Sequence, residues 1–221
     1  MKKNFALALA AIFALLLASA FADNDIEPAD ILYERTTIHA NSNYDETPLS
    51  DAEVTLILNA GFSAPTGGNQ RSTNFFVITD REVMKVIQTG HPYSQPLNTA
   101  PLVIVVAADE ANCRYPELHE MDAGLAAGAM QVQATEMDLS SCVLSIFPQD
   151  ERVNAVRQAL SMPETFKPVL MVAFGRPAVD VVAGASVQNY KAEQVHYNAY
   201  QAAFTADVAA LAAAQAEPDN D

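Results

Sequence analysis

The order of apolar and polar segments in the sequence predicts a single α/β domain. Segments with apolar residues at helical spacing alternate with short apolar runs typical of strands, and no internal repeat or linker divides the chain. The 221 residues, half of them hydrophobic, are enough to bury one sizeable core. We therefore expect one folded domain over residues 23–221, preceded by a targeting segment over residues 1–22.

Local signals justify the elements in order along the chain. Ser50 and Glu53 form a capping box, Asp80 is an N-cap, and acidic residues begin the segment after Gln149, as a helix dipole favours. The run 101–108 (PLVIVVAA) is apolar on both faces, which predicts an interior strand. The expected strands span residues 75–79, 101–108, 142–147 and 169–174. The expected helices span residues 50–61, 80–88, 116–138, 149–160 and 198–216.

The first 22 residues have the composition of a secretory signal peptide. Two lysines form a basic start, residues 5–18 are an apolar run, and residues 20–22 (Ala-Phe-Ala) offer the small residues that a signal peptidase reads. Cleavage after Ala22, or alternatively after Ala20, would release a periplasmic or secreted protein. A membrane anchor is the competing interpretation, although the run is shorter than the roughly 20 residues of a membrane span.

The charge balance excludes two classes of partner. With 12 Lys and Arg against 27 Asp and Glu, the net charge is -15. Such a surface repels nucleic acid and anionic lipid headgroups, so neither is expected as a partner. A cofactor that carries phosphate must therefore be held by a local group of basic residues.

The helix expected over residues 116–138 contains Gly124 and Gly128 among several alanines. A glycine inside a helix costs roughly 1 kcal/mol relative to alanine, so close packing must compensate. Because the two glycines are four residues apart, they lie on one face of the helix. That face packs tightly either within one subunit or against a second subunit.

Several catalytic signatures are absent from the sequence. It contains no GxGxxG, GxxxxGK[ST] or GxSxG motif, and its four histidines lack metal-ligand spacing. We expect no metal and no catalytic side chain, so that a cofactor would supply the reactive group. Cys113 and Cys142 are expected to stay unpaired, with a disulfide as the alternative outside the cytoplasm.

Segments in a fixed order resemble elements of the nitroreductase family. Residues 35–39 (RTTIH) resemble the family's opening Arg-x-Ser-x-Arg element, and residues 60–69 (AGFSAPTGGN) resemble its Ala-Pro-Ser/Thr-x-x-Asn loop. Later landmarks follow at Asp122 and at residues 145–148 (SIFP), 174–177 (FGRP) and 191–198 (KAEQVHYN). The resemblance spans roughly residues 31–200.

The resemblance changes the expected fold and implies an activity. It implies an α+β fold with a central, mostly antiparallel sheet flanked by helices, in an intertwined homodimer with FMN at the subunit boundary. It also implies ping-pong electron transfer from a reduced nicotinamide to a nitroaromatic or quinone-like acceptor. A non-catalytic exported flavin- or ligand-binding protein on the same fold is the alternative.

The resemblance places a cationic site for the FMN phosphate near the start of the domain. Arg35 would donate forked hydrogen bonds, Thr36 lies in the same element, and Thr37 would add a hydroxyl. His39 stands where the family usually has a second arginine, so phosphate binding would weaken as pH rises, unless His39 is only an exposed loop histidine. Lys191 lies near the place of a further cation, with a solvated lysine as the alternative.

The resemblance assigns a second part of the site to the loop after the first long helix. Pro65, Thr66 and Asn69 would contact the flavin ring and the ribityl chain. Two glycines, at residues 67–68, would let the backbone lie close to a flat ring.

Two further positions complete the implied site. The family's usual Gln-Pro-Trp is replaced by Arg71-Ser72-Thr73, and Arg71 either holds a ribityl hydroxyl, binds an anionic substrate or is simply exposed. Backbone amides near Ser145 and Ile146 would face the pyrimidine edge of the flavin and stabilise negative charge there.

Overall fold

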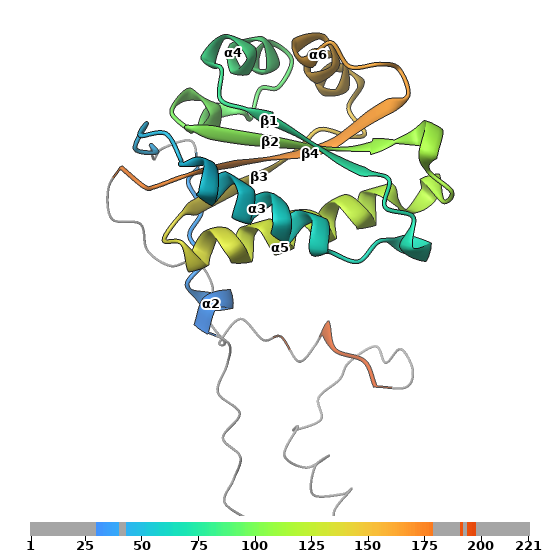
Figure 1. Cartoon of the computed structure of the whole chain (residues 1–221), viewed down its shortest axis with the longest axis horizontal. Helices are drawn as coiled ribbons and strands as arrows, with labels where there is room; N and C mark the ends of the chain where they lie inside the picture. Colours follow the sequence, from blue (N-terminus) through green and yellow to red (C-terminus); the bar gives the residue numbers. More distant parts are fainter. Residues whose placement is uncertain (1–29, 40–42, 179–190, 192–193, 198–221) are drawn as a thin grey trace, which may run out of the picture.

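The computed structural model describes residues 30–39, 43–178, 191 and 194–197. The described residues form a sheet with the strand order β1-β2-β4-β3, in which every neighbouring pair is antiparallel. The strands are β1 (Thr73–Ile78), β2 (Leu102–Asp109), β3 (Ser140–Ser145) and β4 (Phe166–Gly175). Two pairs of helices cover the sheet, α3 (Asp51–Ser63) with α5 (His119–Glu136) on one face and α4 (Arg81–Thr89) with α6 (Asp150–Leu160) on the other (Figure 1). The expected α+β fold is confirmed.

The α/β fold suggested by the alternation of elements is wrong. Ile78 at the end of β1 pairs with Val103 at the start of β2, so the connection through α4 leaves and re-enters the sheet at one end. The connection through α6 does the same, because Ser145 of β3 pairs with Leu170 of β4. The connection through α5 crosses the sheet from β2 to β3. These two strands are not neighbours, because β4 lies between them. Apolar periodicity identifies elements and says nothing of strand direction.

The capping signals in the sequence are confirmed. Ser50 Oγ accepts from the Glu53 amide at 3.3 Å, and Glu53 Oε2 accepts from the Ser50 amide at 2.7 Å. Asp80 caps α4 by accepting from the Glu82 amide at 2.8 Å. A short 3-10 turn over Pro116–Leu118 precedes α5. The expected signal peptide and the helix over residues 198–216 lie outside the described residues, and no described helix is long and apolar enough to cross a membrane.

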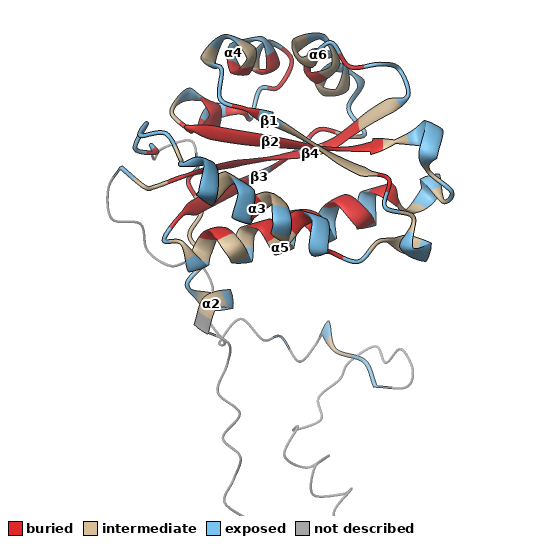
Figure 2. Cartoon of the chain, viewed as in Figure 1, coloured by how far each residue is buried: buried red, intermediate tan, exposed pale blue. Residues whose placement is uncertain are grey.

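Strand β2 lies at the centre of two hydrophobic cores, as its composition predicts. Val103 and Val105 belong to the core beneath α4 and α6, whereas Ile104 and Val106 belong to the core beneath α3 and α5. All four side chains are fully buried, and Figure 2 shows the buried strands between the two helical layers. The two cores make the sheet a rigid support for the loops at its ends.

The cap of α3 makes stability depend on pH. Hydrogen bonds from the Ser50 amide and hydroxyl, aided by Arg176, lower the pKa of Glu53 from 4.5 to about 2. The stability gained is complete above pH 4.5 and is lost as pH falls towards 2. We expect Glu53→Gln to lower the free energy of unfolding by about 1 kcal/mol at neutral pH. Urea unfolding of both proteins over a range of pH should show this difference shrinking in acid.

Exposed Glu136, at the end of α5, provides the matched control. Glu136→Gln should leave the unfolding free energy within about 0.5 kcal/mol of the parent protein at every pH. A difference between Glu53→Gln and the parent that stays constant down to the acid limit would contradict the assigned cause.

Candidate active site

A group of three side chains forms a cationic hollow beside edge strand β3. Arg35 follows the short helix α2 (Asp30–Tyr33), and its Nη1 donates to Thr37 Oγ1 at 2.6 Å. Arg35, Thr37 and His39 line a hollow of about 330 Å³ whose remaining walls are Gln131, Cys142 and Val143. Arg35 pairs with no carboxylate among the described residues, so its charge is available to an anion.

Thr36 has a different role from its neighbours. Its carbonyl accepts from the Ser141 amide at 3.2 Å, and its hydroxyl is hydrogen-bonded to that of Ser140. Because side chains alternate along an extended chain, Arg35 and Thr37 share the other side of this segment. Thr36 therefore anchors the segment to β3 and does not line the hollow.

The wall formed by Cys142 is uncharged. Burial raises the pKa of its thiol above the ordinary value, and nearby Arg35 opposes this shift without cancelling it. Cys113 lies in another region, where its Sγ donates to Gln70 Oε1 at 3.3 Å, and both cysteines are free. Lys191, which is exposed, is not part of the wall. Arg35 and His39 are therefore the basic residues of this hollow.

The loop after α3 is fastened to the first turn of α5 by a buried carboxylate. Asp122 is 1% exposed, and its two oxygens accept from the Gly67 amide and from Gln70 Nε2, each at 2.7 Å. Gln70 Oε1 in turn accepts from the Tyr115 amide at 2.8 Å. The sequence marks Asp122 as a family landmark but does not reveal this role, since a polar residue in a first helical turn is usually solvated.

The two glycines of this loop are needed for packing within the chain. A Cβ on Gly68, whose φ is 56°, would lie 2.3 Å from the ring of Tyr115. A Cβ on Gly67 would lie 2.4 Å from Leu118. Packing against Leu118 and Tyr115 is therefore enough to require glycine at both positions, and close approach of a flat ligand to this backbone stays a prediction.

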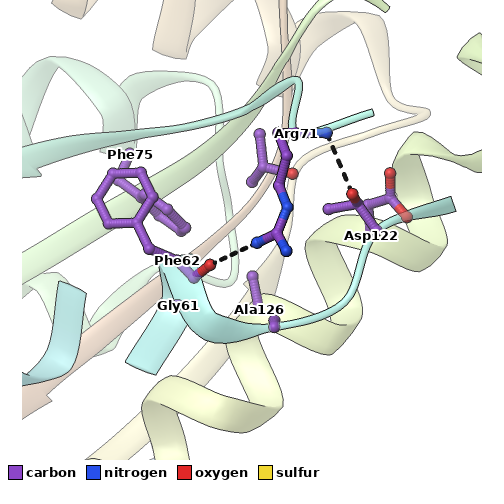
Figure 3. Close-up of a pocket in the computed structure, with 9 residues that line it drawn as sticks. Gly61, Phe62, Arg71, Phe75, Asp122 and Ala126 are labelled. Atoms are coloured by element: carbon purple, nitrogen blue, oxygen red, sulfur yellow. Dashed lines mark hydrogen bonds between the residues drawn. The ribbon is translucent and has the colours of Figure 1, made fainter. Parts of the chain in front are cut away.

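Arg71 organises the polar side chains expected to contact a flavin. Its amide donates to Thr66 Oγ1 at 3.1 Å and its Nε to Asn69 Oδ1 at 2.8 Å. Its Nη1 donates to the Phe62 carbonyl at 3.0 Å (Figure 3). Pro65 is exposed beside them. The side chain of Arg71 stands over a pocket of about 200 Å³ that is lined by Gly61, Phe62, Ala64, Thr66, Thr73, Phe75, Asp122 and Ala126. Thr66 and Asn69 are thus already engaged within the chain.

The end of β3 does not present the expected amide. Ile146 is fully buried, and its amide donates to the Val169 carbonyl at 3.0 Å, so this amide cannot also face a ligand. Ser145 is exposed, and its carbonyl accepts from His91 Nε2 at 2.8 Å and from Arg152 Nη1 at 3.0 Å. The sequence could not show this, because it does not give the pairing partner of the residue after a strand.

The two candidate groups lie at different levels of α5. Gln131 on this helix belongs to the Arg35 hollow, whereas Asp122 fastens the loop at the helix start. Nine residues of helix separate these contacts by about 14 Å along the axis. One chain therefore presents the cationic hollow and the loop over residues 64–70 as separate features.

Comparisons with known proteins agree with this fold. The profile of the Nitroreductase family matches residues 32–89 and 84–176. A protein of Archaeoglobus fulgidus named for NADH dehydrogenase and NAD(P)H nitroreductase is 30% identical over 148 residues, covering 66% of this chain and 83% of the relative.

Solved structures show the same architecture. One from Clostridium acetobutylicum, named for NADH oxidase, is 28% identical with a TM-score of 0.71, covering 77% of this chain and 100% of that one. A nitroreductase from Desulfovibrio desulfuricans in complex with FMN is 24% identical with a TM-score of 0.65, covering 79% and 99%. Because the family profile matches more than half of its length, the chain belongs to the nitroreductase family.

Proposed function

We propose that this protein is an FMN-dependent oxidoreductase that works as a homodimer. It passes electrons from a reduced nicotinamide, or another donor, to a nitroaromatic or quinone-like acceptor by a ping-pong mechanism. The observation that carries the proposal is the cationic hollow of Arg35, Thr37 and His39, which has no internal counter-ion among the described residues.

The chemistry of the hollow fits a phosphate. A guanidinium held by a hydroxyl at 2.6 Å presents aligned donors to a dianion, and hydrogen bonds between charged groups are about twice as strong as neutral ones. His39, which is exposed at the rim, adds positive charge when protonated. Since the protein as a whole carries a charge of -15, anion binding must depend on this local group. FMN supplies the redox chemistry when bound, accepting a hydride and passing on two electrons.

An exposed apolar stripe on α5 supports the homodimer. A Cβ added to Gly124 or Gly128 would meet nothing within 4 Å, so tight packing against the described residues of the subunit does not explain the two glycines. Met121, Leu125 and Val132 on the same face are 50%, 42% and 38% exposed. A second subunit that covers this stripe would remove apolar surface from water and compensate for the low helix propensity of glycine.

Two-fold pairing of α5 would also assemble the site. In an antiparallel pair of these helices, the Gln131 level of one subunit lies beside the Asp122 level of its partner. The Arg35 hollow of one chain would then approach the loop over residues 64–70 of the other, and one FMN would contact both subunits.

The dimer can be tested by Gly124→Leu. Among residues 30–39 and 43–178 nothing lies within 4 Å of the new Cβ, and leucine favours helix, so the isolated subunit should be at least as stable as before. Across a close helix pair the added atoms would clash. We expect sedimentation velocity to show folded monomers for this variant and dimers for the parent protein.

Gln158, exposed on α6, provides the control for an added apolar side chain. Gln158→Leu should leave the dimer intact. If Gly124→Leu also sediments as the parent does, α5 is not the interface.

Flavin content and reduction test the proposed activity directly. The purified chain, incubated with FMN and passed through gel filtration, should remain yellow and should bleach when NADH or NADPH is added without oxygen. A nitroaromatic or quinone should restore the colour, and steady-state turnover should give parallel double-reciprocal lines. A protein that keeps FMN, is reduced by neither nicotinamide and, once reduced by dithionite, passes electrons to neither acceptor would instead be a flavin-binding protein, and one that keeps no flavin would refute the proposal.

We also propose that residues 1–22 direct export and are removed after Ala22. The basic start, apolar run and small residues at 20–22 support this. N-terminal sequencing of the protein from the cell envelope fraction should begin at Asp23. Since nicotinamides are scarce outside the cytoplasm, another donor would then supply the electrons.

A further inference from the structure

We propose that the pocket beneath Arg71 binds a planar aromatic acid, and that Arg71 selects it by its carboxylate. The inference rests on the proposed function, because it identifies the class of acceptor that the enzyme reduces. It concerns a position at which this chain departs from the family pattern, since the family's usual Gln-Pro-Trp is Arg71-Ser72-Thr73 here.

The walls of the pocket fit a flat apolar ring. Phe62 and Phe75 meet edge to face, with their centroids 4.7 Å apart. The opposite walls carry small side chains, Ala64 and Ala126, so about 200 Å³ stays open between α3, β1 and α5. Gly61 lets the Phe75 ring pack closely against α3, because a Cβ there would lie 2.9 Å from that ring. An aromatic ligand could therefore enter without moving the backbone.

The guanidinium of Arg71 is oriented and still has donors to offer. Nε is held by Asn69 and Nη1 by the Phe62 carbonyl, whereas Nη2 makes no hydrogen bond to a described residue. Figure 3 shows the side chain reaching over the pocket towards the Phe62 carbonyl. A carboxylate at the mouth would meet a planar donor whose orientation is already fixed, which favours forked binding.

No carboxylate of the described chain neutralises this cation. None of the ion pairs among the described residues includes Arg71. Asp122 lines the same pocket, but both of its oxygens are occupied by the Gly67 amide and Gln70, and it is 1% exposed. Because the protein as a whole carries a charge of -15, an anionic ligand is repelled by most of the surface. The guanidinium of Arg71 would attract such a ligand to this pocket.

The backbone conformation at Arg71 also indicates that an arginine side chain has a use at this position. Its φ is 54°, a left-handed conformation that a long side chain rarely adopts and that glycine or asparagine would adopt more readily. The side chains of Thr66 and Asn69 hold this conformation. Strain of this kind is retained where the side chain has a use.

Binding of a non-reducible probe pair tests the inference on the FMN-loaded dimer. The probes are 4-fluorobenzoate and its neutral isostere 4-fluorobenzamide, followed by fluorine NMR. The parent protein should bind the benzoate at least about tenfold more tightly than the amide, as one charge-assisted fork provides. Arg71→Gln should reduce this ratio to about one, and the ratio of KM values for 4-nitrobenzoate and 4-nitrobenzamide should change in the same direction.

Two further variants separate charge selection from folding and from the long-range field. Arg71→Gly removes the guanidinium and adopts φ 54° without strain, so it should lose the preference while remaining as stable as the parent protein. Arg114→Gln removes one exposed positive charge from the nearby Tyr115 segment without touching the pocket, and it should keep the preference.

The possible failures are distinct. Equal binding of both probes to the parent protein, or an unchanged ratio in Arg71→Gln, overturns the inference. Loss of FMN from Arg71→Gln also overturns it, because Arg71 would then contact the cofactor. Retention of the benzoate preference in a protein whose bound flavin passes electrons to neither a nitroaromatic nor a quinone would refute the proposed activity and leave the pocket assignment standing, since the probe readout requires no electron transfer.

Discussion

Arg35→Ala is expected to lower FMN affinity by about 10- to 100-fold. A charge-assisted hydrogen bond to a phosphate contributes about 1.5–3 kcal/mol, and Arg35 is the permanently charged residue of the hollow. The substitution leaves Thr37 and exposed His39 to hold a dianion on a protein of charge -15. Quenching of FMN fluorescence during titration with protein measures the affinity, and gel filtration shows whether flavin is retained.

Two variants show whether the loss is specific. Arg35→Lys keeps a point charge but loses the planar fork, so its affinity should lie between those of the parent and Arg35→Ala. Lys85→Ala removes an equal charge from an exposed ion pair with Glu82 on α4 and should bind FMN as the parent does. Full flavin retention in Arg35→Ala would remove this hollow from the cofactor site.

Asp122→Ala is expected to destabilise the fold by about 3 kcal/mol. It leaves two donors, the Gly67 amide and Gln70 Nε2, without an acceptor in a buried place, and each unsatisfied group costs about 1–3 kcal/mol. For a domain of this size the loss corresponds to a fall of about 6–12 °C in Tm. Thermal unfolding followed by circular dichroism measures it, and the freed loop should bind flavin more weakly.

Neighbouring substitutions locate the cause of the loss. Glu120→Ala, at an exposed position in the same turn of α5, should change stability by less than about 0.5 kcal/mol. Asp122→Asn should give an intermediate loss, because its NH₂ group faces the NH₂ of Gln70, and turning Gln70 round would take its carbonyl from the Tyr115 amide. Equal stability of Asp122→Ala and Glu120→Ala would show that the carboxylate does not fasten the loop.

The sequence predicted what depends on near neighbours along the chain. The caps at Ser50 and Asp80 involve residues two or three positions apart, and the two-faced burial of β2 follows from a continuous apolar run. Strand direction depends on contacts between distant segments, so periodicity alone gave the wrong fold class. The order of the family motifs corrected the fold class, because proteins that share these motifs in this order also share a tertiary fold.

The candidate site was less accessible to prediction. Arg35, Thr37 and His39 do line a cationic hollow. Thr36 does not line it, because this residue pairs with Ser141 of β3, a contact that the sequence alone does not reveal. The Ile146 amide and the Asn69 side chain were expected to meet a ligand, yet the amide donates to the Val169 carbonyl and Asn69 Oδ1 accepts from Arg71. Such bonds join residues that are far apart or that lie in a left-handed turn, and neither feature leaves a periodic signal.

In the proposed dimer, the separation of the Arg35 hollow from the Asp122-fastened loop along α5 would couple assembly of the subunits to binding of the cofactor. If each flavin is held by halves of two chains, a lone subunit has little affinity for it, and every bound flavin strengthens the association of the subunits by the same free energy. Holoprotein formation would then be second order in chain concentration. Dilution would release flavin, and a newly made chain at low concentration would stay colourless until it paired with a second copy.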